Sequence, residues 1–365
     1  MDKEIKKRYL VLGNGEVFEG RAFGADCDTV GELVFTTGMC GYIETLTDPS
    51  YYGQIVLHTF PMIGNYGMIP ADEEGEPALR GYVVREWCEQ PSNFRCEGDL
   101  DSYLKKYNII GIYDIDTRHL TKIIRESGVM NGAIVHGDFD KEALLAQIRA
   151  YNVGKVVPKV SVKAKEYYPA ENAKFNVVLM DYGYKFNIRR ELVRRGCNVT
   201  VMPWNSTADE IKALNPDGIM LSNGPGDPAD NTEAIQTLRE LISAQIPTFG
   251  ICLGHQLLAL ANGAKTEKLK YGHRGGNQPV KDLALDRTFI TSQNHGYAVV
   301  SGSVPAEAGE VSHVNGNDGT CEGVRYHNAP AFTVQFHPEA CGGPKDTAYL
   351  FDEFIELMEG KKSCR

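Results

Sequence analysis

The segment 247–256 places a cysteine between two glycines, in the order Gly250-Ile-Cys252-Leu-Gly254. A strand-like apolar run precedes it and a helical pattern follows, which is the arrangement of a nucleophile elbow with cysteine in place of serine. The glycines let a tight turn pass close to neighbouring backbone. At a helix start, unpaired N–H groups and the helix dipole favour the thiolate, the attacking form of a thiol. The pattern predicts that Cys252 is a nucleophile, with the N–H of Leu253 as an oxyanion donor.

A buried thiol in an accidental strand-to-helix turn would show the same pattern. The functional interpretation therefore depends on finding a histidine that can serve as the base. His337 closes an apolar run and is followed by Pro338 and Glu339. Proline forces the preceding residue into extended backbone, in which side chains at i and i+2 point the same way. The imidazole and the carboxylate can therefore be the base and the orienting group of a triad. Of the other histidines, His255 is expected to pack or cap within its helix, and His295 ranks second as the base.

A second glycine-rich segment, 221–228, follows a strand-like run, which is where open α/β sheets bind ligands. It is not a phosphate loop, because the chain contains no G-x-x-x-x-G-K-[ST] motif and no third glycine that would complete G-x-G-x-x-G. Gly224 and Gly226 are instead expected to offer backbone N–H groups to a small ligand or an oxyanion. ATP and dinucleotide binding are not predicted for this chain.

The elements that must position these residues follow from the hydrophobic pattern. After residue 174, short apolar runs alternate with helical patterns, which indicates parallel strands joined by helices. Strands are predicted at 175–180, 198–202, 218–221 and 247–251, helices at 185–195, 207–214, 232–244, 255–262 and 346–358, and further strand-like pieces around residues 289, 297, 311, 322 and 332.

The first half mixes the two kinds of element, with strands predicted at 9–12, 33–36 and 55–58 and helices at 100–107 and 141–150. Between the halves, 151–174 holds two prolines, many lysines and no sustained period, as linkers do. The predicted fold class is α/β. A mixed α+β domain over 1–150 and a linker over 151–173 precede an open, mostly parallel sheet with flanking helices over 174–365.

The composition argues against several classes of function. The 365 residues carry a formal net charge of −10 without a cluster of Lys and Arg, which makes nucleic acid a poor partner. The nine cysteines include no C-x-x-C pair, so reduced thiols are expected and neither a disulfide framework nor a zinc site is indicated. The apolar stretch at 9–12 is too short for a signal peptide or a membrane span, which predicts a cytoplasmic protein.

Six motifs resemble a known family. Three segments of the second half resemble the class I glutamine amidotransferase domain. They are Ser222-Asn-Gly-Pro-Gly-Asp-Pro, Gly250-Ile-Cys-Leu-Gly-His-Gln and His337-Pro-Glu. Three segments of the first half resemble the amino-terminal domain of the carbamoyl-phosphate synthase small-chain family. They are Gly41-Tyr-Ile-Glu-Thr-Leu-Thr-Asp-Pro-Ser-Tyr, Gly64-Asn-Tyr-Gly and Asp114-Ile-Asp-Thr-Arg. The resemblance covers nearly the whole chain.

The resemblance implies a glutaminase in which Cys252, His337 and Glu339 form the triad. It implies that glutamine is held by Ser50, Gly224, Gly226, Leu253, Gln256, Asn294, Gly296 and Tyr297, the last where other members often carry Phe. Without the resemblance, Ser50 is interpreted as a turn residue and Asp116 as a helix cap.

The resemblance also implies a partner. Ammonia would pass through a tunnel to a large subunit, which makes carbamoyl phosphate from bicarbonate and ATP for arginine and pyrimidine biosynthesis. The expected assembly is a cytoplasmic heterodimer. ATP and Mg²⁺ are expected on the large subunit, and no cofactor or metal is expected on this chain.

Three other hypotheses remain open. A glutaminase of another assembly, such as anthranilate or GMP synthesis, is disfavoured by the first-half motifs. A scaffold that binds a large chain without glutaminase activity is disfavoured by the intact triad. A stand-alone γ-glutamyl hydrolase or cysteine peptidase would use the same elbow, but a leader-free chain with an extra domain lacking an obvious catalytic group favours a partnered subunit.

Overall fold

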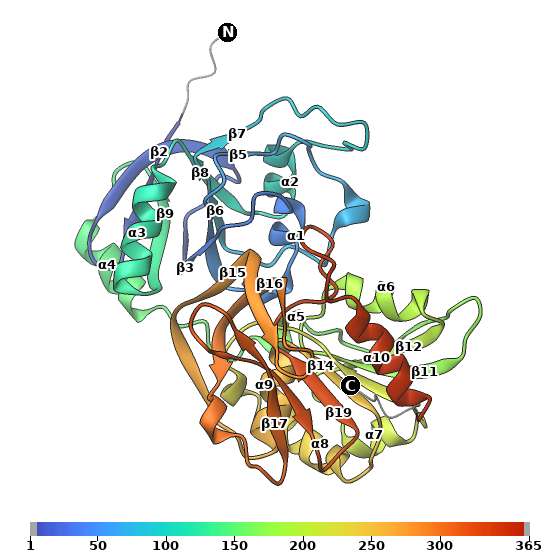
Figure 1. The fold of residues 1–365 in the computed structure, drawn as a ribbon. Helices are drawn as coiled ribbons and strands as arrows, with labels where there is room; N and C mark the ends of the chain where they lie inside the picture. Colours follow the sequence, from blue (N-terminus) through green and yellow to red (C-terminus); the bar gives the residue numbers. More distant parts are fainter. Residues whose placement is uncertain (1–5, 361–365) are drawn as a thin grey trace. The chain divides into compact units, whose positions relative to one another are not determined.

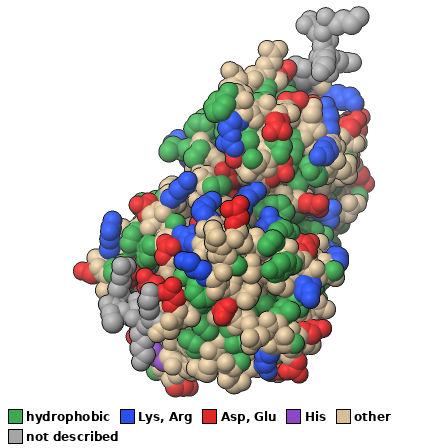
Figure 2. All heavy atoms as spheres, turned by 90° about the vertical axis from the view of Figure 1, so that its right-hand side faces the viewer, with side chains coloured by type: hydrophobic (Ala, Val, Ile, Leu, Met, Phe, Trp, Pro, Cys, Tyr) green, Lys and Arg blue, Asp and Glu red, His purple; other side chains and the backbone are tan. Residues whose placement is uncertain are grey.

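The structure is a computed structural model in which residues 6–360 are described (Figure 1). The chain divides into two compact units, with the division between Val153 and Gly154. None of the helices within residues 6–360 is long and apolar enough to cross a membrane. On the face drawn in Figure 2, Lys and Arg side chains are interspersed with Asp and Glu.

The first unit is built on a closed barrel of mixed parallel and antiparallel strands. Their order around the barrel is β1 (Lys7–Leu12), β2 (Val17–Gly24), β8 (Ile110–Tyr113), β6 (Gly81–Val83), β4 (Gln54–His58), β3 (Thr29–Thr36) and β9 (Met130–His136). The other elements are α1 (Tyr42–Leu46), α2 (Leu100–Lys106), α3 (Thr117–Ser127), α4 (Lys141–Ala150), the small pair β5 (Met62–Ile63) and β7 (Glu86–Trp87), and the short helices η1 (Pro49–Tyr51) and η2 (Pro70–Asp72). The predicted mixed α+β character is confirmed, although the closure of the sheet was not predicted.

One buried cation ties the barrel together. Arg8 of β1 is 2% exposed, and its guanidinium donates to the backbone carbonyls of Phe23, Ala25 and Gly111. Such charge-assisted bonds are among the stronger hydrogen bonds in proteins, and they satisfy the donors that burial removes from water. Arg8 thereby joins β1 to the end of β2 and to β8.

The second unit, described over residues 154–360, is built on a ten-stranded sheet. In sheet order its strands are β10 (Glu166–Tyr168), β12 (Cys197–Pro203), β11 (Phe175–Asp181), β13 (Gly218–Leu221), β14 (Thr248–Ile251), β19 (Ala331–Val334), β18 (Cys321–Tyr326), β17 (Gly309–Asn315), β15 (Thr266–Asp282) and β16 (Arg287–Val299). The strands from β12 to β19 run parallel to one another, and the remaining pairings are antiparallel.

Helices cover both faces of the parallel part of this sheet. They are α6 (Phe186–Arg194), α7 (Ala208–Lys212), α8 (Thr232–Ile242), α9 (Leu253–Ala261) and α10 (Tyr349–Met358). Because successive strand residues face opposite sides, Val178 packs on one face with Leu238 of α8, and Val177 packs on the other with Ile188 of α6 and Phe351 of α10. The open sheet with flanking helices agrees with the prediction, but only the five strands from β12 to β19 are parallel, because the β-rich stretch after α9 adds antiparallel strands to the same sheet.

The segment 151–173 contains two short elements that the sequence pattern did not predict. These are α5 (Val157–Val160) and β10, which pairs antiparallel with β12 at the edge of the sheet. Most of this segment therefore folds with the second unit. The division of the chain into domains at 150 and 174 stays a prediction.

Candidate active site

Cys252 lies on a strained turn between β14 and α9. Its φ is +53°, a region that residues other than glycine rarely adopt, and such strain costs about 1–3 kcal/mol. Its N–H donates to the carbonyl of Val334 at 2.8 Å, which fixes the turn to β19. A Cβ on Gly254 would lie 2.5 Å from the carbonyl oxygen of Leu221, and one on Gly250 would lie 2.8 Å from a methyl group of the neighbouring strand. Glycine is therefore required at 254 by close backbone approach and favoured at 250 by a close side chain.

His337 and Glu339 come from the loop that follows the adjacent strand. Ile251 of β14 is in register with Val334 of β19, so the parallel strands bring the thiol turn and the His337 loop to the same edge of the sheet. Nδ1 of His337 lies 2.7 Å from Oε1 of Glu339, and both residues are buried. Within residues 6–360, Nε2 of His337 has no hydrogen-bond partner. An imidazole held at Nδ1 by a carboxylate presents Nε2 as a base.

Glu339 is ionised although it is fully buried. Burial, the largest single effect, raises the pKa of this carboxyl, but Lys185 and His337 outweigh it and lower the pKa to about 2. The ammonium of Lys185 lies 3.0 Å from Oε1 of Glu339, and the amide of Asn187 donates to the backbone carbonyl of Glu339. No role for Lys185 or Asn187 was predicted from the sequence. Both residues follow the carboxyl end of β11, a central parallel strand, and residues in that position often lie at the ligand-binding edge of such a sheet. This position could have indicated their role.

The loop after β13 packs closely against the loop after β11. The hydroxyl of Ser222 accepts from the N–H of Tyr182 at 2.9 Å, and the carbonyl of Ser222 accepts from the N–H of Gly254 at the elbow, also at 2.9 Å. A Cβ on Gly224 would lie 2.1 Å from the carbonyl oxygen of Tyr182, so only glycine fits there. Gly226 has a φ of +90°. These contacts place the glycine-rich loop beside the elbow.

β16 brings three of the residues implied for glutamine to the elbow. Sγ of Cys252 lies 3.8 Å from the carbonyl oxygen of Asn294. The side-chain amide of Gln256, on α9, donates to the carbonyl of Tyr297 at 2.7 Å. Gly296 lies between Asn294 and Tyr297 in β16. Asn294 thus contacts the thiol, and Tyr297 contacts the helix that begins at the elbow. The role of the implied set in glutamine binding stays a prediction.

The remaining implied residue, Ser50, lies in the first unit within η1. The carboxylate of Asp48 accepts from the N–H of Ser50 at 2.9 Å, which is the turn structure expected from the sequence. Asp116 likewise caps α3 by accepting from the N–H of His119, so its interpretation as a helix cap is confirmed. The role of Ser50 in glutamine binding stays a prediction.

The two alternative histidines are engaged elsewhere. Nδ1 of His255 lies 2.8 Å from the hydroxyl of Thr333, and burial lowers the pKa of His255 to about 3. This agrees with a packing role in its helix. Nδ1 of His295 lies 2.8 Å from the carbonyl oxygen of Tyr297, and burial, followed by the nearby His273, lowers the pKa of His295 well below its usual value. Neither imidazole is held by a carboxylate in the way that His337 is.

Comparison with known proteins agrees with this architecture. Residues 178–357 match the class I glutamine amidotransferase family, which defines the second unit as a glutamine amidotransferase domain. Residues 10–134 match the CPSase domain of the carbamoyl-phosphate synthase small chain. The carbamoyl phosphate synthase small chain of Bacillus cereus is 52% identical over 357 residues, covering 98% of this chain and 97% of that one. That of Clostridium perfringens is 52% identical over 351 residues, covering 96% and 99%.

The chain belongs to the family of carbamoyl phosphate synthase small chains, the glutamine amidotransferase subunits of that synthase. The resemblance inferred from the sequence motifs and the predicted fold class are thereby confirmed.

Proposed function

We propose that this chain hydrolyses glutamine to glutamate and ammonia, with Cys252 as nucleophile, His337 as general base and acid, and Glu339 as the group that orients His337. The observation that carries the proposal is the 2.7 Å contact between Nδ1 of His337 and Oε1 of Glu339, beside the strained turn of Cys252 at the same edge of the sheet.

The chemistry follows from this arrangement. The Cys252 thiolate attacks the side-chain amide carbon of glutamine and forms a tetrahedral oxyanion. The N–H of Leu253 and the backbone of the 224–226 loop stabilise that charge. His337 donates a proton from Nε2 to the departing ammonia, leaving a γ-glutamyl thioester. His337 then takes a proton from water, which hydrolyses the thioester to glutamate and frees the thiol.

Glutamine binding is proposed for residues of the second unit, and the contacts of Asn294 with the Cys252 thiol and of Tyr297 with Gln256 support this. The proposed contacts come from Gly224, Gly226, Leu253, Gln256, Asn294, Gly296 and Tyr297. If the contact at Tyr297 is made through its backbone, Tyr in place of Phe changes little.

The proposed partner is a carbamoyl-phosphate synthase large subunit, to which the ammonia passes through a protected tunnel. Membership of the small-chain family supports this proposal. The large subunit would use ATP, Mg²⁺ and bicarbonate to make carbamoyl phosphate for arginine and pyrimidine biosynthesis in the cytoplasm. No cofactor is proposed for this chain.

The test is a Cys252→Ala variant in complex with the large subunit, supplied with glutamine or with ammonia. Removing a nucleophile that acts with its base costs on the order of 10⁶-fold in rate, so glutamine-dependent synthesis should be lost while ammonia-dependent synthesis remains. Cys341→Ala is the matched control, because Cys341 is an exposed thiol in the same unit. Glutamine-dependent product from the Cys252→Ala complex would overturn the assignment.

Covalent labelling distinguishes an active glutaminase from a scaffold that binds the large subunit without glutaminase activity. An electrophilic glutamine analogue should modify Cys252 in one-to-one ratio and leave the Cys252→Ala variant unmodified, as peptide mass spectrometry would show. An unlabelled wild-type thiol would support the scaffold instead.

A further inference from the structure

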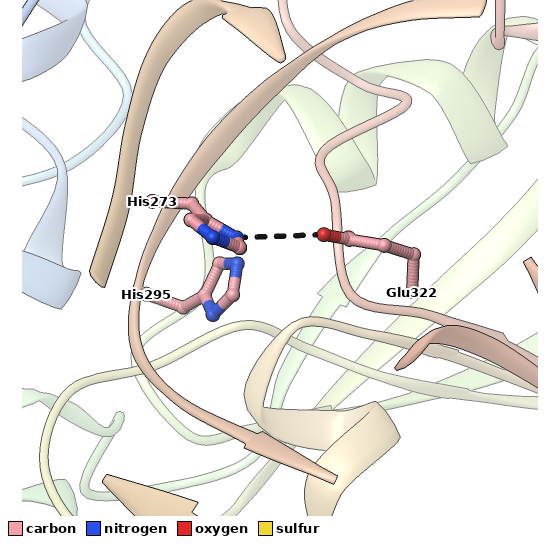
Figure 3. A group of neighbouring side chains, drawn as sticks. All are labelled: His273, His295 and Glu322. Atoms are coloured by element: carbon pink, nitrogen blue, oxygen red, sulfur yellow. Dashed lines mark ion pairs between the residues drawn. The ribbon is translucent and has the colours of Figure 1, made fainter. Parts of the chain in front are cut away.

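A cluster of buried titratable side chains lies outside the proposed triad. His273 of β15, His295 of β16 and Glu322 of β18 point toward one another (Figure 3). Glu322 is fully buried, and Nδ1 of His273 lies 3.5 Å from its Oε1. The two imidazole rings are perpendicular, with centroids 5.0 Å apart. The proposed chemistry assigns no function to His273 or Glu322.

Both oxygens of the Glu322 carboxylate accept hydrogen bonds. Oε1 accepts from the amide of Asn315 at 2.9 Å, and Oε2 accepts from the amide of Gln293 at 3.0 Å. The orientation of the Asn315 amide is fixed, because its oxygen accepts from the N–H of Asn317. A buried carboxylate is costly unless a cation neutralises it, and His273 is placed to do so.

His273 is itself held between two carboxylates. Its Nε2 lies 2.8 Å from Oδ2 of Asp318, on the opposite side of the ring from Glu322. Burial, the largest single effect, opposes a charge on this imidazole. The carboxylates of Glu322 and Asp318 together outweigh it and raise the pKa of His273 above its usual value.

From Glu322 the contacts continue to the residues proposed to bind glutamine. The oxygen of the Gln293 amide lies 3.1 Å from Nε2 of His295, and Nδ1 of His295 lies 2.8 Å from the carbonyl oxygen of Tyr297. The same carbonyl accepts from the side-chain amide of Gln256 on the elbow helix. Neutral His295 carries one ring N–H, which donates to either the Tyr297 carbonyl or the Gln293 oxygen but not to both. The series from the partly exposed Asp318 to the junction of β16 with α9 is therefore continuous in close contacts, with one of its steps being packing and not a hydrogen bond.

We propose that His273 and Glu322 are positioning residues for glutamine: their buried ion pair holds Gln293 and His295 in place, and through them the Tyr297 carbonyl and the Gln256 amide. This inference rests on the proposed function, since it deepens the account of that site. Loss of the pair lets the Tyr297 carbonyl and the Gln256 amide move, which weakens the binding of glutamine more than the chemical step.

The same three side chains also form a donor set that binds zinc in some proteins. The geometry favours the hydrogen-bonded arrangement, because the amides of Asn315 and Gln293 donate to both oxygens of Glu322. A metal ion would have to displace at least one of these donors. Zinc binding is therefore treated as an outcome that would overturn the proposal.

The test compares His273→Gln and Asp318→Asn with the control His327→Gln in the complex with the large subunit. His327 is an exposed histidine just beyond β18, and Asp318 is partly exposed, so Asp318→Asn tests the ion-pair network at a position tolerant of substitution. We expect His273→Gln to raise KM for glutamine about two- to tenfold, the range for one lost hydrogen bond, with kcat changed less than about twofold. Asp318→Asn should shift KM in the same direction by less, and His327→Gln should not.

Two further measurements make the outcomes decisive. Ring ¹⁵N NMR should show that the imidazole of His273 stays protonated at both nitrogens to a higher pH than a free imidazole does, and this signal should be absent in His273→Gln. Unchanged KM in both His273→Gln and Asp318→Asn overturns the proposal, as does stoichiometric zinc in the wild-type protein that His273→Gln removes. Labelling of Cys252 by the glutamine analogue separates the two levels: unchanged KM with normal labelling refutes only the positioning role, whereas no labelling refutes the proposed function.

Discussion

Replacing Lys185 with Met should disable the orienting carboxylate of the proposed triad. The ammonium of Lys185 lies 3.0 Å from Oε1 of Glu339, in an environment from which water is excluded. Met has a similar length and no charge, so the variant removes the ion pair and keeps most of the packing. The proposed chemistry requires Glu339 to be ionised. Removing the charge of Lys185 therefore tests that chemistry directly.

The magnitude can be worked from the structure. The pKa of Glu339 is lowered from 4.5 to about 2. This difference corresponds to about 3 kcal/mol in favour of the ionised form, since each pKa unit is worth about 1.4 kcal/mol. Two unit charges at that separation attract by about 5.5 kcal/mol at an effective dielectric constant of about 20. Because the lost attraction exceeds the net stabilisation, the pKa of Glu339 in the variant should lie above 4.5.

The sign of the pH dependence follows. In the wild type the folded-state pKa is depressed, so the contribution of Glu339 to stability is present above pH 4.5 and is lost as the pH falls toward 2. In the variant the pKa is raised, so protonation begins at a higher pH and disables the triad. At pH 7 the variant should be less stable by about 3–5 kcal/mol, as expected when one partner of a buried pair is removed.

The assay measures kcat/KM for glutamine between pH 5 and 8 and urea unfolding at pH 7. The ratio of variant to wild-type kcat/KM should fall as the pH falls. Lys281→Met is the control, because Lys281 pairs with Asp286 on the surface and its loss should change stability by less than about 1 kcal/mol. A constant ratio across this pH range, together with normal stability, would refute the reasoning.

Two further predictions concern the elbow and the core behind it. Gly254→Ala should destabilise the second unit by about 1–3 kcal/mol in urea unfolding, because the new Cβ would lie 2.5 Å from a backbone oxygen. The control Gly302→Ala, where a Cβ meets nothing within 4 Å, should stay near wild type, and equal stability of the two variants would contradict the steric argument. Phe249→Ala should cost about 3–5 kcal/mol, because the ring stacks on Phe332 with centroids 4.5 Å apart and also packs on α10. Thermal unfolding checks this, and a loss under 1 kcal/mol would mean that the site collapses without a cavity.

Local pattern predicted the second unit well because its central strands are buried on both faces and form continuous apolar runs, while its helices each bury one apolar stripe. The strand predicted at 175–180 is β11 (Phe175–Asp181), and the helix predicted at 232–244 is α8 (Thr232–Ile242). By contrast, β15 (Thr266–Asp282) was missed. Glycines and exposed polar residues interrupt its alternation, and it shifts register against β16 between Lys268 and His273.

The candidate site was predictable where one short peptide carries the chemistry and not where distant segments meet. Cys252 and the His337–Glu339 pair follow from glycine spacing and from proline, both of which are local signals. Lys185 was missed because its ion pair joins the loop after β11 to the loop after β19. The periodicity of a sequence does not show which residues of two remote loops meet in the fold. The barrel of the first unit escaped prediction for the same reason, since its closing pairs depend on register between remote strands.

The position of Arg8 and β1 in that barrel has a consequence for the order of folding during synthesis. β1 lies between β2 and β9, and its residue Leu10 is paired with Ile134. Because β9 is synthesised more than 100 residues after β1, the edge of β1 that pairs with β9 stays uncovered until nearly the whole unit has been made. The nascent chain therefore exposes an unpaired apolar edge during that interval, and such edges invite association with other chains.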